Sequence, residues 1–244
     1  MLIPVWFVKE EVRGLFPDHT SAIVAPGEEI NRNWMSRLVR CRDGDDYYYI
    51  KTYASRGRGL RKFIGRSRVR AEWENLQAFV AMEIPTAELV AYGESEASGY
   101  YRGTLITREV RGAIDLATLV DNSHSLFCDR QWRLQVIGQL SEIVQKMHGD
   151  GFVHNDLKWR NILVDVTGDP AVYLIDCPLG RRMSGPFLAR GKIKDLACLD
   201  KIAKKQLSEI ERLRFYLEYK AKTQLSVKDK KEIYRVLRFF EGRE

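Results

Sequence analysis

The sequence predicts an α+β protein of two lobes, a strand-rich lobe followed by a mainly helical one. Two observations predict this class. Short β-branched and aromatic runs separated by turn residues fill the first hundred or so residues, whereas apolar residues at three- and four-residue spacing dominate from residue 113 onward. We expect an N-terminal lobe at 1–107, a hinge at 108–112 and a C-terminal lobe at 113–244.

The first lobe is expected to be an antiparallel sheet with one helix. Its candidate strands are the apolar N-terminal run, 21–25, 34–40, 47–53, 87–92 and 100–107. Asp43-Gly44-Asp45-Asp46 is typical of a turn between two of these strands. The helix is expected over 67–82, with Ala71, Leu76, Phe79 and Val80 pointing inward.

The second lobe begins with a helix and continues through a hairpin into a helical tail. Trp132, Val136, Leu140 and Met147 lie at helical spacing, and Gly149 and Gly151 end that helix. Two short aliphatic runs at 162–166 and 171–175 are joined by a turn at 167–170, which predicts a hairpin. From Lys192 onward three amphipathic stretches predict helices.

The composition excludes several classes of protein. An apolar fraction of 45% with 30% charged residues is typical of a globular protein, and no apolar run approaches the length that crosses a bilayer. The four cysteines are scattered, which argues against a disulfide framework or structural zinc and favours the reducing cytoplasm. The first residues lack the basic region and cleavage site of a signal peptide.

The net charge of +7 favours anionic partners. Nucleotides, anionic lipid headgroups and nucleic acids all satisfy this condition. The sign of the charge does not choose among them.

One short segment carries the strongest chemical signal. It reads His154-Asn155-Asp156-Leu157-Lys158-Trp159-Arg160-Asn161 and has the form H-x-D-x-x-x-x-N. Phosphoryl transfer explains these residue types, because a carboxylate must accept or orient the proton of the attacking hydroxyl. Asp156 fits that role, Lys158 can neutralise charge on the transferred group, and Asn161 can bind Mg²⁺. We expect His154 to brace the loop through hydrogen bonds.

A second metal ligand is expected from Asp176, which ends the aliphatic strand Val172-Tyr173-Leu174-Ile175. Mg²⁺ prefers hard oxygen ligands beside phosphate oxygens and water. The hairpin returns Asp176 toward Asn161, so the two residues predict one magnesium site. A lone Asp at a strand end more often caps a turn, but the spacing, the hairpin and the Asn agree here.

ATP also requires a cation for its α- and β-phosphates, held by an acidic partner. Lys51 in the strand and Glu72 in the following helix are the expected pair, with Glu74 as the alternative acid. The segment from Thr107 to Gly112 is expected to be the hinge, where backbone groups of Glu109 and Val110 would meet adenine. Only Ala25-Pro26-Gly27-Glu28 offers a glycine for a phosphate loop, and it lacks a G-x-G-x-x-G pattern.

With these residues, the chain resembles the protein-kinase-like superfamily over nearly its full length. It more closely resembles the bacterial lipopolysaccharide kinases of the Kdo/WaaP type. That finer resemblance rests on Lys51-Thr52-Tyr53 leading into the arginine-rich segment, on Ile84-Pro85-Thr86, and on Lys194-Asp195-Leu196-Ala197 followed by Arg212-Leu213-Arg214-Phe215 and Tyr219. Asp176 is followed by Cys177-Pro178 instead of Phe-Gly, and no A-P-E motif follows.

The resemblance implies a two-lobed protein-kinase-like fold and ATP- and Mg²⁺-dependent phosphorylation of a sugar hydroxyl, Kdo or heptose. The implied acceptor is the lipopolysaccharide inner core, or lipid A–core. The implied location is cytoplasmic, peripheral on the cytoplasmic face of the inner membrane. The missing A-P-E motif argues against an ordinary protein kinase with a phosphorylated activation loop.

Basic residues gather in a segment that leads into the first long helix. We hypothesise that they meet phosphates of the acceptor or an anionic membrane surface; this set is Arg56, Arg58, Arg61, Lys62 and Arg66, with Arg190 further on. A solvated basic face is the competing interpretation. Positive charge at a helix start opposes the helix dipole, so it is not placed there for stability.

Several other functions stay open. The chain can instead be a small-molecule kinase, a protein Ser/Thr/Tyr kinase, or a pseudokinase that serves as a scaffold on anionic lipid. Lys51, Asp156, Asn161 and Asp176 are all present, which argues against lost activity. Nucleic acid is not expected as a partner, because no nucleic-acid motif accompanies the arginines.

Overall fold

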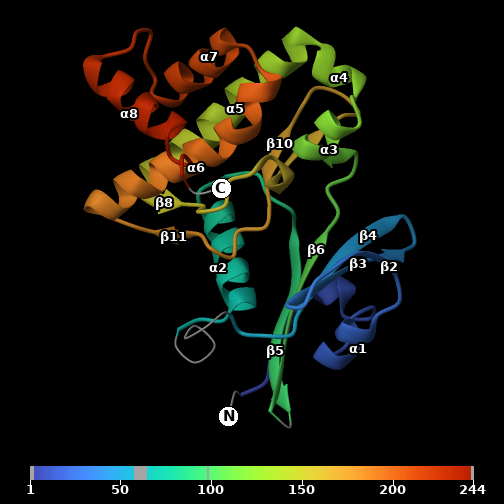
Figure 1. Ribbon diagram of the computed structural model, residues 1–244. Coiled ribbons are helices and arrows are strands. Elements are labelled where there is room, and N and C mark those ends of the chain that lie inside the picture. Colours follow the sequence, from blue (N-terminus) through green and yellow to red (C-terminus); the bar gives the residue numbers. More distant parts are fainter. Residues whose placement is uncertain (1–2, 58–64, 98, 243–244) are drawn as a thin grey trace. The chain divides into compact units, whose positions relative to one another are not determined.

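The computed structural model describes residues 3–57, 65–97 and 99–242 (Figure 1). The chain divides into two compact units, which we call the N-terminal unit (1–78 with 87–110) and the C-terminal unit (79–86 with 111–244). Residues 79–86, which the sequence-based boundary places in the first lobe, group with the C-terminal unit. The roles predicted for the two lobes stay predictions.

The N-terminal unit is built on a six-stranded antiparallel sheet in the order β1-β5-β6-β4-β3-β2. Its strands are β1 Val5–Val8, β2 Glu28–Arg32, β3 Ser36–Asp43, β4 Asp46–Tyr53, β5 Leu89–Ala97 and β6 Tyr100–Arg108. The helical elements are η1 Glu10–Val12, α1 His19–Val24 and α2 Arg68–Ala81, the last of which crosses the unit boundary. The tight turn predicted at Asp43–Asp46 joins β3 and β4.

The strand expected at 21–25 is wrong, because these residues belong to the helix α1. The Asp18 carboxylate accepts the backbone N–H of Ser21 at 2.8 Å and so caps the first turn. Ala22 is fully buried on the inner side. The N-terminal sheet therefore carries this second helix besides α2, and the expectation of one helix is corrected.

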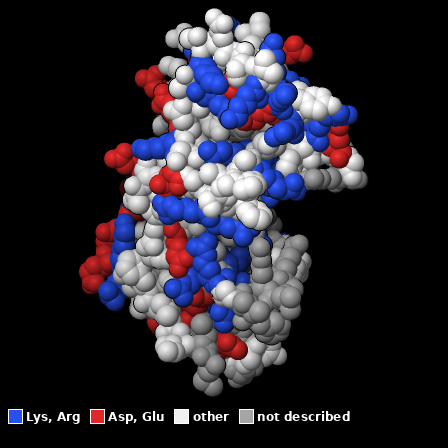
Figure 2. Space-filling model, turned by 90° about the vertical axis from the view of Figure 1, so that its left-hand side faces the viewer, with Lys and Arg blue, Asp and Glu red and all other residues white. Residues whose placement is uncertain are grey.

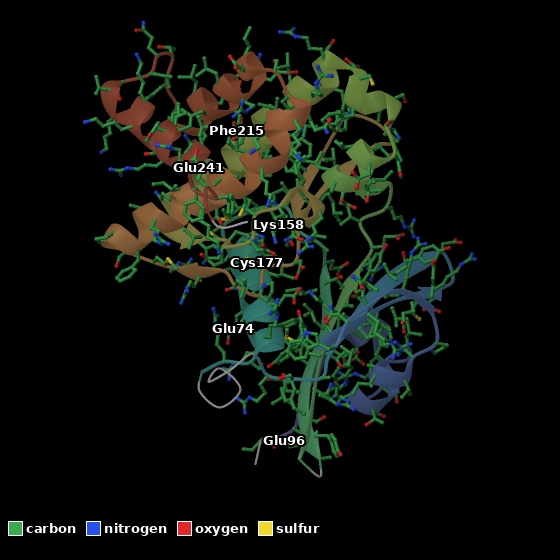
Figure 3. All side chains as sticks on the ribbon, viewed as in Figure 1. Glu74, Glu96, Lys158, Cys177, Phe215 and Glu241 are labelled. Carbon is green, nitrogen blue, oxygen red and sulfur yellow. The ribbon has the colours of Figure 1, made fainter. Side chains whose placement is uncertain are left out.

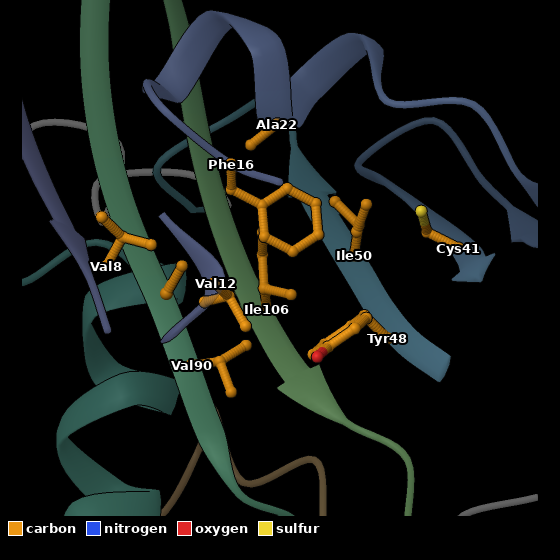
Figure 4. Packing of buried hydrophobic residues seen from close by; sticks show 10 residues of the cluster. Val8, Val12, Phe16, Ala22, Cys41, Tyr48, Ile50, Val90 and Ile106 are labelled. Carbon is orange, nitrogen blue, oxygen red and sulfur yellow. The ribbon is translucent and has the colours of Figure 1, made fainter. Parts of the chain in front are cut away.

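An apolar cluster fills one face of this sheet (Figure 4). Phe16 is fully buried and meets Tyr48 edge-on, with ring centroids 5.8 Å apart. Ile50 and Ile106, partners on β4 and β6, pack into the same cluster. The alternation of these strands therefore orients one face to the core. Val80 was expected to point inward but is 62% exposed, since the buried stripe of α2 runs through Phe79 beside it.

The C-terminal unit is mainly helical, as expected from the sequence. Its helices are α3 Leu116–Asp121, α4 Ser125–Cys128, α5 Arg130–Gly149, α6 Gly185–Gln206, α7 Glu209–Tyr219 and α8 Val227–Leu237, with η3 at Trp159–Asn161. Its strands are β7 Ala113–Asp115, β8 Phe152–Val153, β9 Ile162–Asp165, β10 Val172–Leu174 and β11 Arg181–Arg182. They form the small sheets β10-β9-β7 and β11-β8.

The long helix α5 begins and ends where its sequence dictates. The side chain of Asp129 accepts the backbone N–H of Gln131 at 2.8 Å and caps the start. Gly151, with φ of 72°, turns the chain into β8. In the described ranges, no helix is both long and apolar enough to cross a membrane.

Candidate active site

The H-x-D-x-x-x-x-N segment forms a tight loop between β8 and β9. The Asp156 carbonyl accepts the backbone N–H of Lys158 at 2.8 Å and the side-chain Nδ2 of Asn161 at 2.9 Å. The amide group of Asn161 is thereby fixed in orientation, because its nitrogen donates within the loop. Its Oδ1 oxygen is the atom that remains suited to bind a metal ion.

The Asp156 carboxylate lies between two cations. Lys158 Nζ is 2.6 Å from Asp156 Oδ1, and Arg160 is 3.7 Å from Oδ2. The Asp156 side chain is 24% exposed and that of Lys158 46% exposed, so both can be reached by a ligand. This arrangement can accept a proton at the carboxylate and stabilise negative charge at the ammonium group.

Asp176 directly follows the hairpin strand β10. The backbone N–H of Ile175 donates to the Asn161 carbonyl at 3.0 Å, so the chain reaches Asp176 one residue beyond a hydrogen bond to Asn161. Asp176 has a φ of 53°, in the left-handed region that non-glycine residues seldom adopt. Such a conformation persists where surrounding structure enforces it, which is common at functional sites.

The donor set of Asp176 and Asn161 fits Mg²⁺. Carboxylate and amide oxygens are hard ligands, and Mg²⁺ typically takes one or two protein ligands alongside phosphate oxygens and water. Among the described residues no group of three or more His, Cys, Asp or Glu side chains forms a metal cluster. Lys158 and the buried Cys177, which follows Asp176, are labelled in Figure 3.

Asp195 of α6 holds the start of the loop by hydrogen bonds. Its fully buried carboxylate accepts the backbone N–H of His154 at 2.7 Å and that of Asn155 at 2.8 Å. His148 Nε2 lies 3.3 Å from the same carboxylate, and the Tyr219 hydroxyl lies 2.9 Å from His148 Nδ1. A chain of hydrogen bonds thus runs from Tyr219 of α7 through His148 of α5 and Asp195 of α6 to the loop.

Asp195 is not among the site residues that the sequence predicts. The available signal was an acidic residue on the apolar side of a helix, in Lys194-Asp195-Leu196-Ala197. Acids are almost never fully buried unless they are paired, so this position indicates a partner. The identity of that partner, a pair of backbone N–H groups, emerges only from the fold.

His154 is fully buried and stacks on Phe79, with ring centroids 6.1 Å apart. Burial lowers the pKa of this imidazole, although the nearby carboxylates of Asp195, Asp176 and Asp156 oppose that shift. A neutral, packed ring braces the loop by its shape. The loop hydrogen bonds come from the His154 backbone.

In the N-terminal unit, Lys51 of β4 pairs with Glu72 of α2. Lys51 Nζ lies 2.9 Å and 3.1 Å from the two carboxylate oxygens. Glu72 is buried and also accepts a hydrogen bond from the Tyr53 hydroxyl. Glu74, the alternative partner, instead binds Arg66 at 2.7 Å and Arg70 at 2.8 Å.

The predicted hinge residues lie at the end of β6. The Glu109 carboxylate accepts from Arg40 at 2.6 Å and from the Tyr49 hydroxyl at 3.3 Å. The backbone N–H of Glu109 donates to the Tyr47 carbonyl at 2.8 Å. Glu109 therefore has its carbonyl, and not its N–H, to offer an adenine ring. Val110 follows it as the last residue of the N-terminal unit.

Gly27 has a packing role. A Cβ atom at this position would lie 2.4 Å from the Arg40 carbonyl oxygen and 2.7 Å from Val39. Glycine is required where two backbones approach this closely. Gly27 precedes β2, whereas the β2–β3 connection is formed by Asn33-Trp34-Met35. The segment 25–28 therefore does not form the turn between β2 and β3.

The predicted basic residues that the structure describes are Arg56 and Arg66 in the N-terminal unit and Arg190 in the C-terminal unit. Arg66 is held by Glu74, and Arg56 is half-buried in the N-terminal unit. Arg190 lies in the C-terminal unit on α6, with its guanidinium 5.8 Å from the Phe239 ring centroid. Arg58, Arg61 and Lys62 lie outside the described residues.

The C-terminal unit also contains an apolar cavity of about 310 Å³ between its helices, which is partly open to solvent. Its walls are mostly aliphatic and aromatic; representative lining residues are Trp132, Val136, Leu140, Leu199, Phe215 and Val236. Phe215, labelled in Figure 3, marks its α7 side. A cavity of this size and character suits an apolar ligand.

A family model for the lipopolysaccharide kinase (Kdo/WaaP) family matches residues 24–234. The chain belongs to this family. It is therefore a kinase, a phosphotransferase with a hydroxyl group as acceptor, and the resemblance and the enzyme class expected from the sequence are confirmed.

The fold of this family member is also found in a solved structure described as WaaP in complex with acyl carrier protein. The TM-score is 0.75 at 19% identity, and the match covers 97% of this chain and 96% of that one. The expected α+β, kinase-like fold is confirmed by this similarity. A comparison with curated proteins finds no significant match.

Proposed function

We propose that the protein transfers the γ-phosphoryl group of ATP, with Mg²⁺, to a hydroxyl of Kdo or heptose in the lipopolysaccharide inner core. Membership of the family supports a kinase of lipopolysaccharide. The observation that carries the proposal is the Asp156 loop, held on Asp195 and joined to Asp176 through the Ile175–Asn161 hydrogen bond.

In this mechanism Asp156 orients the acceptor hydroxyl and takes up its proton as the oxygen attacks the γ-phosphorus, while the bond from the γ-phosphorus to the bridging oxygen breaks and ADP leaves. Lys158, already 2.6 Å from Asp156, stabilises charge on the transferred group. Lys51, oriented by Glu72, holds the α- and β-phosphates. Glu109 and Val110 offer backbone groups to adenine.

Asn161 and Asp176 would hold Mg²⁺ through their side-chain oxygens. The ion, when bound, neutralises phosphate charge during transfer. The acceptor is lipid-linked, so we propose that the enzyme works peripherally on the cytoplasmic face of the inner membrane. The basic side chains Arg56, Arg58, Arg61, Lys62, Arg66 and Arg190 are proposed contacts for acceptor phosphates.

The test is ATP turnover with deacylated core oligosaccharide, with mass spectrometry to locate the added phosphate. Asp156→Asn and Asp176→Asn should each lower kcat by about 100-fold or more, the range of a lost general base or charge-stabilising ligand. Asp169→Asn is the matched control, since Asp169 is exposed in the turn of the same hairpin. Parent turnover no faster than that of the two site variants would contradict the proposal.

A second proposal concerns a partner. The structural neighbour is described in complex with acyl carrier protein, and this chain has a partly open apolar cavity of about 310 Å³. We propose that an acyl carrier protein docks on the C-terminal unit and places its acyl chain in that cavity. Acyl-loaded carrier should bind the parent more tightly than unacylated carrier, and Val136→Trp should remove that difference by filling the cavity. Equal binding of both carrier forms would contradict the proposal.

A further inference from the structure

The helix α8 has two halves of opposite character. The inward half consists of Asp229, Glu232, Ile233 and Val236, which are buried or half-buried. Ile233 and Val236 line the apolar cavity, and Leu237, which is 50% exposed, lines its edge as well. Every other residue of the helix is exposed; this set, the α8 outer face, is Val227, Lys228, Lys230, Lys231, Tyr234, Arg235 and Leu237.

Both acids of α8 are used on the inward side. Asp229 is 2.7 Å from Lys222 and accepts the capping hydrogen bonds of Ser226, and this pairing lowers the pKa of its carboxyl group. Glu232 is 2.6 Å from Lys220. The α8 outer face therefore contains cations and apolar side chains and no acid.

The four cations of this face lie within the eight residues 228–235. Among the described residues, none of the four has an acidic partner within ion-pair distance. Lys228 and Lys231, like Lys231 and Arg235, stand one turn apart, where like charges destabilise a helix. An anionic surface would relieve this repulsion.

Apolar side chains are exposed beside the cations on the α8 outer face. Val227 is 72% exposed, Tyr234 57% and Leu237 50%, and their spacing places them along one side of the helix. Singly exposed apolar residues are common on proteins, but here three share one face with four cations. Aromatic and aliphatic residues interleaved with Lys and Arg characterise helices that lie in a membrane interface.

The segment after α8 packs against α6. After α8 the chain returns to α6, where Lys201 Nζ lies 5.5 Å from the Phe240 ring centroid and Arg190 lies 5.8 Å from that of Phe239. Phe187, one turn before Arg190 on α6, is 74% exposed. Figure 2, which faces the side of Figure 1 that carries α8, shows Lys and Arg spread over the upper part of the molecule.

We propose that the α8 outer face binds an anionic lipid bilayer, with Lys228, Lys230, Lys231 and Arg235 at the headgroups and Val227, Tyr234 and Leu237 between them. A membrane is favoured over an acidic protein because one exposed face combines a row of apolar side chains with neighbouring cations. The inference relies on the proposed function only for its choice of a lipid-linked acceptor, and the binding itself requires no catalysis.

The first test is sedimentation with vesicles of phosphatidylcholine, with or without phosphatidylglycerol. The parent should bind only the anionic vesicles, and less as salt is raised. Lys228→Glu, Lys231→Glu and Arg235→Glu together should lower binding by about 100-fold or more, since each cation near such a surface contributes roughly fivefold.

The matched control changes net charge equally at exposed arginines of the N-terminal unit: Arg13→Glu, Arg42→Glu and Arg102→Glu. Its binding should stay within a few-fold of the parent. Equal losses in the two triple variants would mean that overall charge drives binding, which would overturn the proposal. Val227→Ser with Tyr234→Ser should weaken binding but preserve its salt dependence, because only apolar contacts are removed.

Turnover separates this proposal from the kinase reaction itself. The triple variant Lys228→Glu, Lys231→Glu and Arg235→Glu should phosphorylate soluble deacylated core oligosaccharide at the rate of the parent. It should lose activity on acceptor that is embedded in vesicles. Loss of acyl carrier protein binding with vesicle binding retained would assign the face to that protein and overturn the membrane proposal. No activity in the parent on either acceptor, with vesicle binding intact, would count against the proposed function alone.

Discussion

The carboxylate of Asp195 lies 2.7 Å from the backbone nitrogen of His154 and holds the loop that carries Asp156. Because this carboxylate is buried and accepts two N–H groups, Asp195→Ala should destabilise the protein by about 3 kcal/mol. It should also lower kcat by displacing Asp156. Urea unfolding and steady-state kinetics measure the two effects.

Asp200→Asn is the control for that variant, since Asp200 lies further along α6 and pairs with Arg212 at 2.7 Å. It should cost stability with little change in kcat. A similar kcat loss in both variants would show that Asp195 acts only through general stability.

Tyr219 is expected to set the tautomer of His148. Its hydroxyl lies 2.9 Å from His148 Nδ1, and donation to that atom leaves the proton on Nε2, which faces Asp195. Tyr219→Phe should therefore lower kcat several-fold with KM for ATP unchanged, and lower the free energy of unfolding by about 1 kcal/mol. Tyr216→Phe, on the same helix, should leave kcat unchanged. The idea fails if kcat of Tyr219→Phe equals that of the parent.

Lys51 and Glu72 should act as one unit in ATP binding. Lys51→Met is expected to reduce kcat/KM for ATP by about 100-fold, because it removes the cation that we propose binds the phosphates. Glu72→Gln should have a smaller effect in the same direction. Glu74→Gln tests the alternative pairing and should have almost none, since Glu74 binds Arg66 and Arg70. A larger loss for Glu74→Gln than for Glu72→Gln would contradict this assignment.

The buried imidazole of His154 should make stability depend on pH. Its folded-state pKa is lowered below 6.5, so between the two pKa values the unfolded state binds more protons. The free energy of unfolding should therefore be highest above pH 6.5 and decline as the pH falls below it, by at most about 1.4 kcal/mol per pH unit for one group.

His154→Phe keeps a ring against Phe79 and removes the titrating group. Its unfolding free energy, from urea titrations at several pH values, should decline less steeply below pH 6.5 than that of the parent. Some decline should persist, because burial also lowers the pKa of His19. Parallel curves for parent and variant would rule out His154 as a source of the dependence.

Gly27 should matter for packing and not for phosphate binding. Gly27→Ala places a methyl group 2.4 Å from the Arg40 carbonyl oxygen, so the strand must shift and thermal stability should fall. Gly14→Ala is the control, since no atom lies within 4 Å of its added Cβ. Unchanged KM for ATP in the folded Gly27→Ala protein is the expected kinetic result, and a selective rise in KM would restore the phosphate-loop interpretation.

Local sequence patterns determined the elements with regular spacing. The period of Trp132, Val136, Leu140 and Met147 predicted α5, and the hairpin of β9 and β10 followed from two aliphatic runs around a turn. The pattern failed at α1, where a capping Asp18 outweighed the strand-like composition of 21–25. A segment of six residues is too short to show a helical period in its sequence. The Asp18 side chain, which accepts the Ser21 N–H, caps the helix that forms there.

By itself the sequence determined the α+β class. It also supplied the residues proposed for the site, because H-x-D-x-x-x-x-N and the later Asp176 can be read as local motifs. It also ranked Glu72 above Glu74 as the partner of Lys51. Only the tertiary structure decided that Asp195, His148 and Tyr219 support the loop, and that the cations of α8 share one exposed face with apolar residues. The physical reason is that burial and pairing depend on contacts between residues far apart in the chain, which no local pattern encodes.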